Sequence, residues 1–389
     1  MNDLQAAHDA GNAVAKGGRV VLALNSGSSS FKFGLYRVQA PSASASGIES
    51  LLSDSTDASH AQDAIAGIPD QFAKAGLPVP TAIGHRVVHG GPALRQHCII
   101  DDAVLLQLET ATPFAPLHTP AALAIIRAAQ QLFSGLPQVA CFDTLFHASM
   151  PDVARVLPIP AALQTEGIQR YGFHGLSCES IVQQLGCNLP ARIIIAHLGN
   201  GASITAVDRG RSVDTSMGLT PSGGIIMGSR SGDLDPGVMA YLAREKNFDA
   251  AMLVDLVDHQ SGLLGISGVS SDMRHLHAAA PSNARARLAI QMFCASASKQ
   301  IAAMISVLDG VDLIVFTGGI GENDALVRTE ICRGLSWIGV SLDEDRNHVA
   351  SRHISHARSR CQVRVMASQE DGQIARHTWA LMHRQVQTS

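Results

Sequence analysis

Short apolar runs that end in glycine or small polar residues recur along the chain, and they predict the strands of its sheets. Residues 20–24 lead into the small-residue turn 25–30, and alternate apolar positions then mark a returning strand over 31–35. Residues 193–195 lead in the same way into Gly199-Asn200-Gly201 and a second returning strand. Period-two alternation is typical of strands, and glycine permits a sharp turn or the close approach of a ligand. Two such units, one early and one in mid-chain, indicate an internal duplication with both turns facing one ligand.

Further apolar runs predict strands at 82–88, 139–142 and 312–317. Segments with helical periodicity or helix-forming composition predict helices over 101–109, 119–133, 177–185, 236–245, 249–258, 283–308 and 373–384. Residues 40–60 are rich in serine and alanine, and we expect a surface loop or a weak element there. Because strands and helices alternate throughout, the predicted class is α/β.

Length, composition and net charge limit the classes of protein to which the chain can belong. The 389 residues suggest two domains, and 46% hydrophobic residues are enough for sizeable cores. A net charge of −4 argues against nucleic-acid or membrane-surface partners. Seven cysteines without a CxxC pair fit a reducing cytosol rather than a disulfide scaffold. Residues 1–18 lack the apolar core of a signal peptide, no uncharged apolar run is long enough to cross a bilayer, and we expect a cytoplasmic protein whose first 18 residues are disordered.

Two glycine-rich segments are candidates for binding an anion. Residues 218–236 surround a lone cation, Arg230, whose planar guanidinium matches phosphate or carboxylate. The strand at 312–317 leads into the glycine-rich turn 318–323 and then a helix, which is a second anion-binding arrangement. No GxxxxGK[ST] motif is present. Taken alone, a glycine-rich hairpin with a surface arginine is an equally good interpretation of the first segment.

An ordered set of short motifs resembles the acetate kinase family, the short-chain carboxylate kinases. The motifs are LNSGSSSFKF, GHRVVHGG, PLHTP, FDTLFH, YGFHG, HLGNGASI, MGSRSGDLDP, SGLLGISG, FTGGIGEN and SQED. The resemblance implies an α/β fold of duplicated actin-like, ribonuclease H-like domains with the active site in the interdomain cleft. It implies an N-terminal domain over 19–147, joined by a C-terminal helix at 372–389, and a nucleotide-binding and dimerisation domain over 148–371.

The implied reaction is reversible, Mg²⁺-dependent transfer of the γ-phosphoryl group of ATP to acetate by direct in-line displacement, giving acetyl phosphate and ADP. A carboxylate is already an anion, so catalysis must neutralise charge and position two substrates rather than supply a base. The resemblance assigns Arg86 and Arg230 to the carboxylate and the transferring phosphoryl group, His174 to its equatorial oxygens, and Asp143 to the metal and substrate network. From the residues alone, a packed loop histidine is the simpler interpretation of His174, and a helix cap is the alternative for Asp143. Propionate or butyrate kinase is the alternative function.

The resemblance also assigns binding residues by class. It places Val88, Leu117, Phe173 and Pro221 in the acyl pocket, although ordinary core is the simpler interpretation of four apolar residues. It places the nucleotide near Ser28, Ser30, Lys32, His197, Leu198, Gly199, Asn200, Gly201, Asp272, Met273, Arg274, Gly319, Ile320, Gly321, Glu322 and Asn323. It places Asn25 and Glu370 beside Mg²⁺, through water, with Mn²⁺ as an alternative ion.

The chain departs from the family pattern at a few positions. Cys178 stands where a supporting histidine is usual, and Met273 replaces an aromatic residue, which affects the expected adenine contacts. Two other classes share the implied fold. An actin-like or Hsp70-like binding protein would need a peptide- or polymer-binding region, for which no residues are left. A sugar kinase would need a polar pocket. The family resemblance further implies a homodimer that acts on small-molecule substrates.

Overall fold

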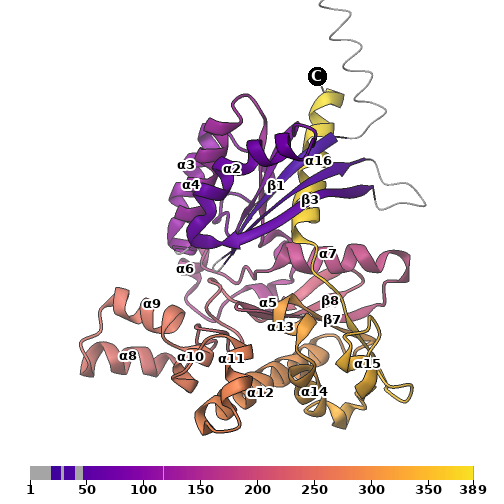
Figure 1. Ribbon diagram of the computed structural model, residues 1–389. Helices are drawn as coiled ribbons and strands as arrows, with labels where there is room; N and C mark the ends of the chain where they lie inside the picture. The colour runs from indigo at the N-terminus through magenta and orange to yellow at the C-terminus, as the bar shows by residue number, and fades with distance from the viewer. Residues whose placement is uncertain (1–18, 28–29, 40–46, 117, 389) are drawn as a thin grey trace, which may run out of the picture. The chain divides into compact units, whose positions relative to one another are not determined.

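The computed structural model describes residues 19–27, 30–39, 47–116 and 118–388, which form two compact units (Figure 1). Unit 1 comprises residues 1–145 and 369–389, and unit 2 comprises residues 146–368. The chain therefore leaves unit 1 once and returns to it through its last helix. The expected N-terminal extension, together with Ser28 and Leu117, lies outside the described residues.

Unit 1 is built on a six-stranded sheet in the order β3-β2-β1-β4-β6-β5. Its strands are β1 (Arg19–Ser26), β2 (Ser30–Val38), β3 (Ile48–Asp57), β4 (Ala82–Val87), β5 (Cys98–Ile99) and β6 (Gln138–Phe142). β1, β2 and β3 form an antiparallel meander, while β4 is parallel to both β1 and β6. Its helices are η1 (Ala58–His60), α2 (Ala61–Lys74), α3 (Asp102–Thr110), η2 (Thr112–Phe114), α4 (Thr119–Leu132) and α16 (Glu370–Thr388).

Alternation along β1 divides the core of unit 1 between the two faces of its sheet. Leu22 and Leu24 belong to a cluster with residues of α2 and α4. Val21, which points to the opposite face, packs with Ala375 of α16. Gly84 lets α16 approach β4, because a Cβ atom there would lie 2.2 Å from Thr378 Oγ1.

Unit 2 is built on a five-stranded sheet in the order β11-β10-β7-β8-β9. Its strands are β7 (Arg192–Leu198), β8 (Ala202–Asp208), β9 (Arg211–Thr215), β10 (Leu313–Thr317) and β11 (Gln362–Val365). Its helices are α5 (Asp152–Arg155), α6 (Ala161–Thr165), α7 (Gly175–Leu185), η4 (Gly186–Asn188), α8 (Pro236–Glu245), α9 (Ala250–His259), α10 (Gly262–Ser267), α11 (Met273–Ala279), α12 (Ala284–Val307), α13 (Gly318–Asn323), α14 (Ala325–Arg333), η5 (Ser336–Ile338) and α15 (Glu344–His348). The short helix η3 (Leu145–Ser149) spans the boundary between the units.

The two sheets share one topology, which confirms the predicted α/β class and duplication. In each sheet, the first three strands in the chain form an antiparallel meander. Two further strands lie side by side next to the first strand and run parallel to it. β1 therefore corresponds to β7, β4 to β10, and β6 to β11. The two strand–turn–strand patterns of the sequence are the first hairpins of these sheets.

Two local features differ from or refine the sequence-based expectations. Within 40–60, where a surface loop or a weak element was expected, residues 48–57 form the ten-residue strand β3. β3 lies at the sheet edge with mostly exposed polar side chains, so backbone pairing with β2 decides its conformation rather than an apolar pattern. Helix α12 is long and apolar enough to cross a membrane by length and composition alone. Its buried residues lie on one face, and α12 contacts β7, β8 and β9, as expected of a core helix.

Candidate active site

In unit 1, the predicted residues Arg86 and Asp143 form a buried ion pair. Arg86 is on β4, and Asp143 directly follows the neighbouring strand β6. Arg86 Nη2 donates to Asp143 Oδ2 at 2.7 Å, and the two side chains are 11% and 0% exposed. Burial alone would lower the pKa of Arg86, but the charges of Asp143, Glu370 and Asp371 outweigh it and raise the pKa above its ordinary value. The guanidinium is therefore fixed in place and permanently charged.

Arg86 retains a donor that is suited to a substrate oxygen. Nη1 donates to the Ser26 carbonyl at 3.2 Å, in the turn after β1. Nε is buried and has no hydrogen-bond partner among the described residues. Buried donors are nearly always paired in native proteins, so an unpaired guanidinium N–H indicates a position for a ligand acceptor.

Next to this ion pair, Asn25 gathers two carboxylates at the start of α16. Its amide nitrogen donates to Glu370 Oε2 at 3.0 Å and to Asp371 Oδ1 at 2.7 Å. Burial raises the pKa of Asp371, and the nearby charge of Glu370 adds to this, while Lys32 and Arg86 act in the opposite direction. Asn25 lies at the end of β1, so strand and helix bring together residues that are 345 positions apart.

This cluster fits a small divalent cation. Mg²⁺ binds hard oxygen ligands and keeps several waters, and the cluster offers carboxylate oxygens of Glu370 and Asp371 with the Asn25 amide oxygen beside them. Two crowded carboxylates repel each other, and a cation would relieve that repulsion. Asp371 was not among the predicted site residues. Two features of the sequence could have indicated Asp371, namely its acidic side chain and its position next to Glu370.

In unit 2, His174 projects from a strained turn at the start of α7. Its backbone is left-handed, with φ of 57°, which is uncommon for a residue other than glycine. Nδ1 lies 3.0 Å from Ser203 Oγ of β8, and the ring stacks on His197 with centroids 4.2 Å apart. His197 Nδ1 in turn lies 2.8 Å from Ser177 Oγ. The imidazole is thus oriented through Nδ1 and by stacking.

His174 and Arg230 converge on the predicted second phosphate turn. A Cβ atom on Gly201 would lie 3.2 Å from His174 Nε2 and 3.3 Å from Arg230 Nη1. Both side chains are nearly buried, at 9% and 8% exposed. Arg230 Nη1 also donates to the Pro221 carbonyl at 3.4 Å. A guanidinium N–H donor and an imidazole nitrogen meet beside a backbone without a side chain, which suits an oxyanion that must approach closely.

Backbone contacts hold the Arg230 loop. Met227 N donates to the Arg230 carbonyl at 3.2 Å. Gly262, with φ of 60°, fits beneath the loop because a Cβ atom there would lie 2.3 Å from the Met227 carbonyl oxygen. A Cβ atom on Gly228 would lie 2.2 Å from Asn200 Oδ1. Glycine at this position therefore lets the Arg230 loop pack closely against the turn after β7. Gly228 within the 218–236 segment and Gly262 outside it therefore have packing roles beside the Arg230 loop.

The turn after β7 also touches the turn after β10. Gly318, with φ of 78°, lies where a Cβ atom would be 2.7 Å from the Leu198 carbonyl oxygen. A Cβ atom on Gly199 would be 3.8 Å from Gly319 N. The helix α13 that follows contains the predicted residues Gly319, Ile320, Gly321, Glu322 and Asn323. The two glycine-rich turns that were predicted separately are thus neighbours within unit 2.

Glu322, which is expected on the nucleotide side, has its carboxylate engaged by two backbone amides of unit 2. Its Oε1 accepts from Gly318 N at 2.9 Å and from Ser368 N at 3.1 Å. The carboxylate therefore caps the first turn of α13 and ties it to the end of unit 2. Sequence reasoning could not separate this structural role from ligand binding, because Ser368 is 46 residues away.

The third nucleotide-side segment begins α11. Asp272 caps this helix through Arg274 N, and the Arg274 hydrogen bond lowers the pKa of Asp272 to about 2. Arg274 is largely exposed, whereas Met273 is buried at 3% exposure. His277 of α11 pairs with Asp324 at 2.8 Å and so ties this helix to the end of α13.

The described acyl-pocket residues lie in both units. Val88 follows β4 in unit 1 and is 5% exposed. Phe173 precedes His174 in unit 2 and is 1% exposed, and Pro221 is also buried. Cys178, at the position of the supporting histidine, is fully buried in an apolar cluster with Ile181. Its thiol also donates to Thr205 Oγ1 of β8 at 3.7 Å.

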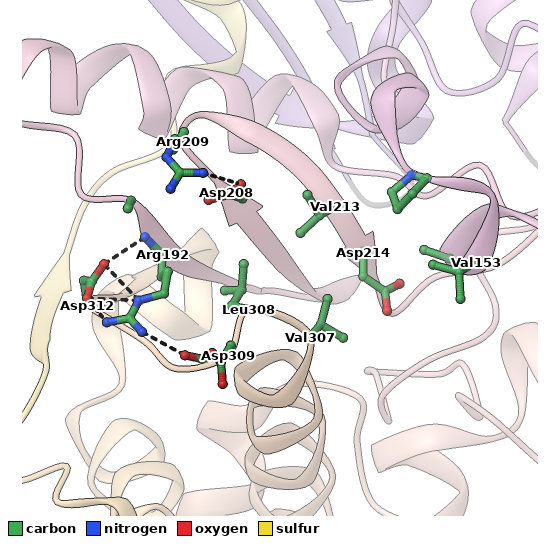
Figure 2. Close-up of a pocket in the computed structure, with 13 residues that line it drawn as sticks. Val153, Arg192, Asp208, Arg209, Val213, Asp214, Val307, Leu308, Asp309 and Asp312 are labelled. Atoms are coloured by element: carbon green, nitrogen blue, oxygen red, sulfur yellow. Dashed lines mark hydrogen bonds and ion pairs between the residues drawn. The ribbon is translucent and has the colours of Figure 1, made fainter.

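A pocket of about 840 Å³ on unit 2 contains none of the predicted site residues (Figure 2). It lies where β7 begins and β8 ends, and its rim includes the ion pairs Arg192–Asp312 and Arg209–Asp208. The two predicted glycine-rich turns of unit 2 follow the carboxyl ends of β7 and β10 instead, which is where α/β sheets usually bind ligands. We therefore assign no part of the reaction to this pocket.

Comparison with known proteins shows the family to which the chain belongs. A model of the acetokinase family matches residues 20–376. The acetate kinase of Methylocella silvestris is 47% identical over 305 residues, covering 77% of this chain and 75% of that protein. The acetate kinase of Rhodopseudomonas palustris is 39% identical and covers 93% of this chain and 98% of its own.

Solved structures share the fold over nearly the whole chain. The propionate kinase of Francisella tularensis superposes with a TM-score of 0.82 at 36% identity, covering 93% of this chain and all of that one. The acetate kinase of Porphyromonas gingivalis gives 0.80 at 33% identity, covering 94% of this chain and all of that one. The family match and these identities show that the chain belongs to the acetokinase family of phosphotransferases.

Proposed function

We propose that this protein is an acetate kinase, which transfers the γ-phosphoryl group of ATP reversibly to acetate and forms acetyl phosphate and ADP. The convergence of His174 Nε2 and Arg230 Nη1 on Gly201 carries the proposal. A transferring phosphoryl group spreads negative charge over three equatorial oxygens, so donors arranged in advance are the main catalytic requirement. Membership of the acetokinase family supplies the acceptor class.

Arg86 is proposed to hold the acceptor carboxylate. Its unpaired Nε and its fixed position beside Asp143 suit a planar anion. Asp143 then acts by orienting Arg86 rather than as a base, because acetate needs no deprotonation to attack phosphorus. Direct in-line displacement follows, with no covalent intermediate on the enzyme and inversion at a chiral γ-phosphate.

Asn25, Glu370 and Asp371 are proposed to hold Mg²⁺ through water. When bound, the ion would neutralise charge on the phosphates of ATP. Mn²⁺ has similar ligand preferences and is an expected substitute.

The nucleotide is proposed to follow the glycine-rich turns of unit 2. Gly199, Gly201 and Gly319 expose backbone at neighbouring turns, which permits close approach of phosphate oxygens. Asp272 and Arg274 are proposed for the base end. Because Met273 is buried, we expect it to shape this end through packing rather than by stacking on adenine.

The proposal has an alternative for one feature, the length of the carboxylic acid that accepts the phosphoryl group. Val88, Phe173 and Pro221 are proposed to surround the methyl group, and the solved relative from Francisella tularensis is a propionate kinase. Propionate or butyrate kinase activity therefore remains the second candidate, because pocket volume decides between them.

We further propose a cytoplasmic homodimer that associates through unit 2. Helix α8 has no buried residue, yet it carries Val238 and Tyr241 at 40% and 51% exposure. The adjacent α9 exposes Met252 and Val254 at 44% and 43%. Such an apolar surface is more typical of an interface than of a solvated helix pair.

Trapping acyl phosphate with hydroxylamine tests the function directly. Purified protein with ATP and Mg²⁺ should form hydroxamate with acetate, and more slowly with propionate and butyrate. A preference for propionate or butyrate would select the alternative. No hydroxamate with any of the three acids, from folded protein, would contradict the proposed function.

A further inference from the structure

A buried histidine that the proposed chemistry does not use lies against the backbone of His174. His147 in η3 is 1% exposed, and both of its ring nitrogens have partners within unit 2. Nδ1 lies 2.8 Å from Ser212 Oγ, and Nε2 lies 2.9 Å from the Phe173 carbonyl oxygen. His147 therefore contacts the peptide unit that immediately precedes the proposed catalytic imidazole.

The two contacts determine which nitrogen carries the proton. A carbonyl oxygen only accepts, so Nε2 must donate to Phe173. In the neutral ring Nδ1 then accepts from the hydroxyl of Ser212, which is fully buried on β9. A strand of the sheet thus fixes one tautomer, and that tautomer presents its N–H to the Phe173 carbonyl.

The segment that His147 contacts is held on both sides. Tyr171 N and Gly172 N donate to the Gly218 carbonyl at 3.0 and 3.3 Å. Gly172 has a φ of 73°, and a Cβ atom there would lie 2.8 Å from His147 Cδ2, so the chain rests directly on the imidazole. A left-handed backbone at His174 persists only where its surroundings impose it. His147 is one of the groups in direct contact with the residues before His174.

We propose that His147 is a positioning residue for phosphoryl transfer, acting through the Phe173 carbonyl on the direction in which His174 points. The inference rests on the proposed function, because it gives His174 a role in the reaction. It goes beyond that function because His147 touches neither substrate nor the reacting atoms in the proposal. A displacement of about 1 Å at a reacting group can cost on the order of 100-fold in rate.

The test is a double-substitution cycle in the full-length protein. His147→Ala should lower kcat by roughly 10- to 100-fold, with KM for ATP and acetate changed much less. In a His174→Ala background, the same change should have almost no further effect on kcat, because its target is gone. His147→Gln should recover much of the activity, since its amide can still donate near the position of Nε2.

Controls separate positioning from stability. Ile331→Ala removes buried apolar volume from α14, which carries neither His147, Ser212 nor the 171–174 segment, so it should lower Tm while leaving kcat largely unchanged. Ser212→Ala keeps the imidazole but frees its tautomer, and it should give a smaller kcat loss that also vanishes in the His174→Ala background. Ser212→Ala replaces His147→Ala in the cycle if the latter does not fold.

The outcomes of the cycle are distinct. Multiplicative losses in the double variants, with an active wild type, would overturn the role of His147 and leave the proposed function intact. A wild type without acyl phosphate formation would overturn both.

Discussion

The two units share one strand order, yet matching strands end in different chemistry. In unit 1, β4 carries Arg86 and β6 is followed by Asp143. Two oppositely charged side chains therefore lie where these strands end. In unit 2, β10, which corresponds to β4, leads into Gly318 instead. The shared topology determines where ligand-facing residues are placed. The residue types at the strand ends then decide whether the site offers ions or exposed backbone.

The difference has an energetic consequence. Unit 1 orients its arginine with a buried carboxylate, whereas the Arg230 loop of unit 2 is held by backbone hydrogen bonds and close glycine contacts. Removing one partner of a buried ion pair leaves an uncompensated charge, at a cost of about 3–5 kcal/mol. We therefore expect that removing Arg86 from unit 1 lowers both the activity and the free energy of unfolding. Removing Arg230 from unit 2 should lower the activity alone.

The largest expected effect comes from the two arginines. Arg86→Ala and Arg230→Ala should each lower kcat by roughly 100-fold or more, as for loss of a transition-state charge contact. Only Arg86→Ala should also lower the free energy of unfolding, by about 3 kcal/mol, because Asp143 is then buried without its partner. Steady-state kinetics and urea unfolding measure the two quantities.

A second substitution sharpens that contrast. Asp143→Asn in the Arg86→Ala background should restore part of the lost stability and none of the activity, because the uncompensated charge is removed. Equal stability losses for the two single arginine variants would show that the units do not differ in this way.

One carboxylate from each unit provides the next comparison. Glu370→Gln should raise the Mg²⁺ concentration for half-maximal activity by roughly tenfold or more, as for a group that acts through metal-bound water. KM for acetate should change little. Glu322→Gln should leave the Mg²⁺ requirement unchanged, because that carboxylate is engaged with Gly318 N and Ser368 N. Equal shifts in the two variants would remove Glu370 from the metal site.

Local patterns in the sequence were sufficient for the repeated hairpins and failed for the polar edge strand. The apolar runs at 20–24 and 193–195 predicted β1 and β7, because buried strands have a clear hydrophobic signature. Strand β3, over 48–57, has no such signature, since its side chains are mostly exposed and pairing with β2 defines it. Propensity cannot report a conformation that tertiary pairing imposes.

The candidate site shows a similar division. Motif resemblance selected Arg86, His174 and Arg230, but no local pattern indicates that Arg86 bonds to Asp143, 57 residues away. The contact between His147 and Phe173 was also missed, because it depends on how η3 packs against the turn before α7. Sequence supplied the proposed catalytic groups, and the structure added the contacts that these side chains make.

The acyl pocket gives a smaller expected effect. Val88→Ala should enlarge the space beside Arg86 and raise activity with propionate and butyrate relative to acetate by around tenfold, since one methylene is worth about 1–3 kcal/mol in such a pocket. The change should appear mainly in KM, because the alkyl end binds similarly in ground and transition states. A collapse of kcat with unchanged selectivity would make Val88 a core residue of unit 1.

The smallest expected effect concerns pH, and it compares an ion pair from each unit. Arg86 stays charged at any working pH, whereas the His277–Asp324 pair of unit 2 titrates. The hydrogen bond to Asp324 raises the pKa of His277 above 6.5 despite partial burial. Burial alone would raise the pKa of Asp324, but the His277 hydrogen bond and other contacts lower it below 3.8.

The sign of the pH effect follows from these shifts. The His277 contribution to stability is complete below pH 6.5 and is lost as pH rises through its raised pKa, while the Asp324 contribution is lost as pH falls through its lowered pKa. His277→Gln should therefore cost about 1 kcal/mol at pH 5.5 and clearly less at pH 8.5, for a partly exposed pair. Urea unfolding of both proteins at both pH values measures this difference. Asp324→Asn is a poorer probe, because Asp324 also caps α14 through Val327 N. An equal cost at the two pH values would mean that the pair contributes through packing rather than charge.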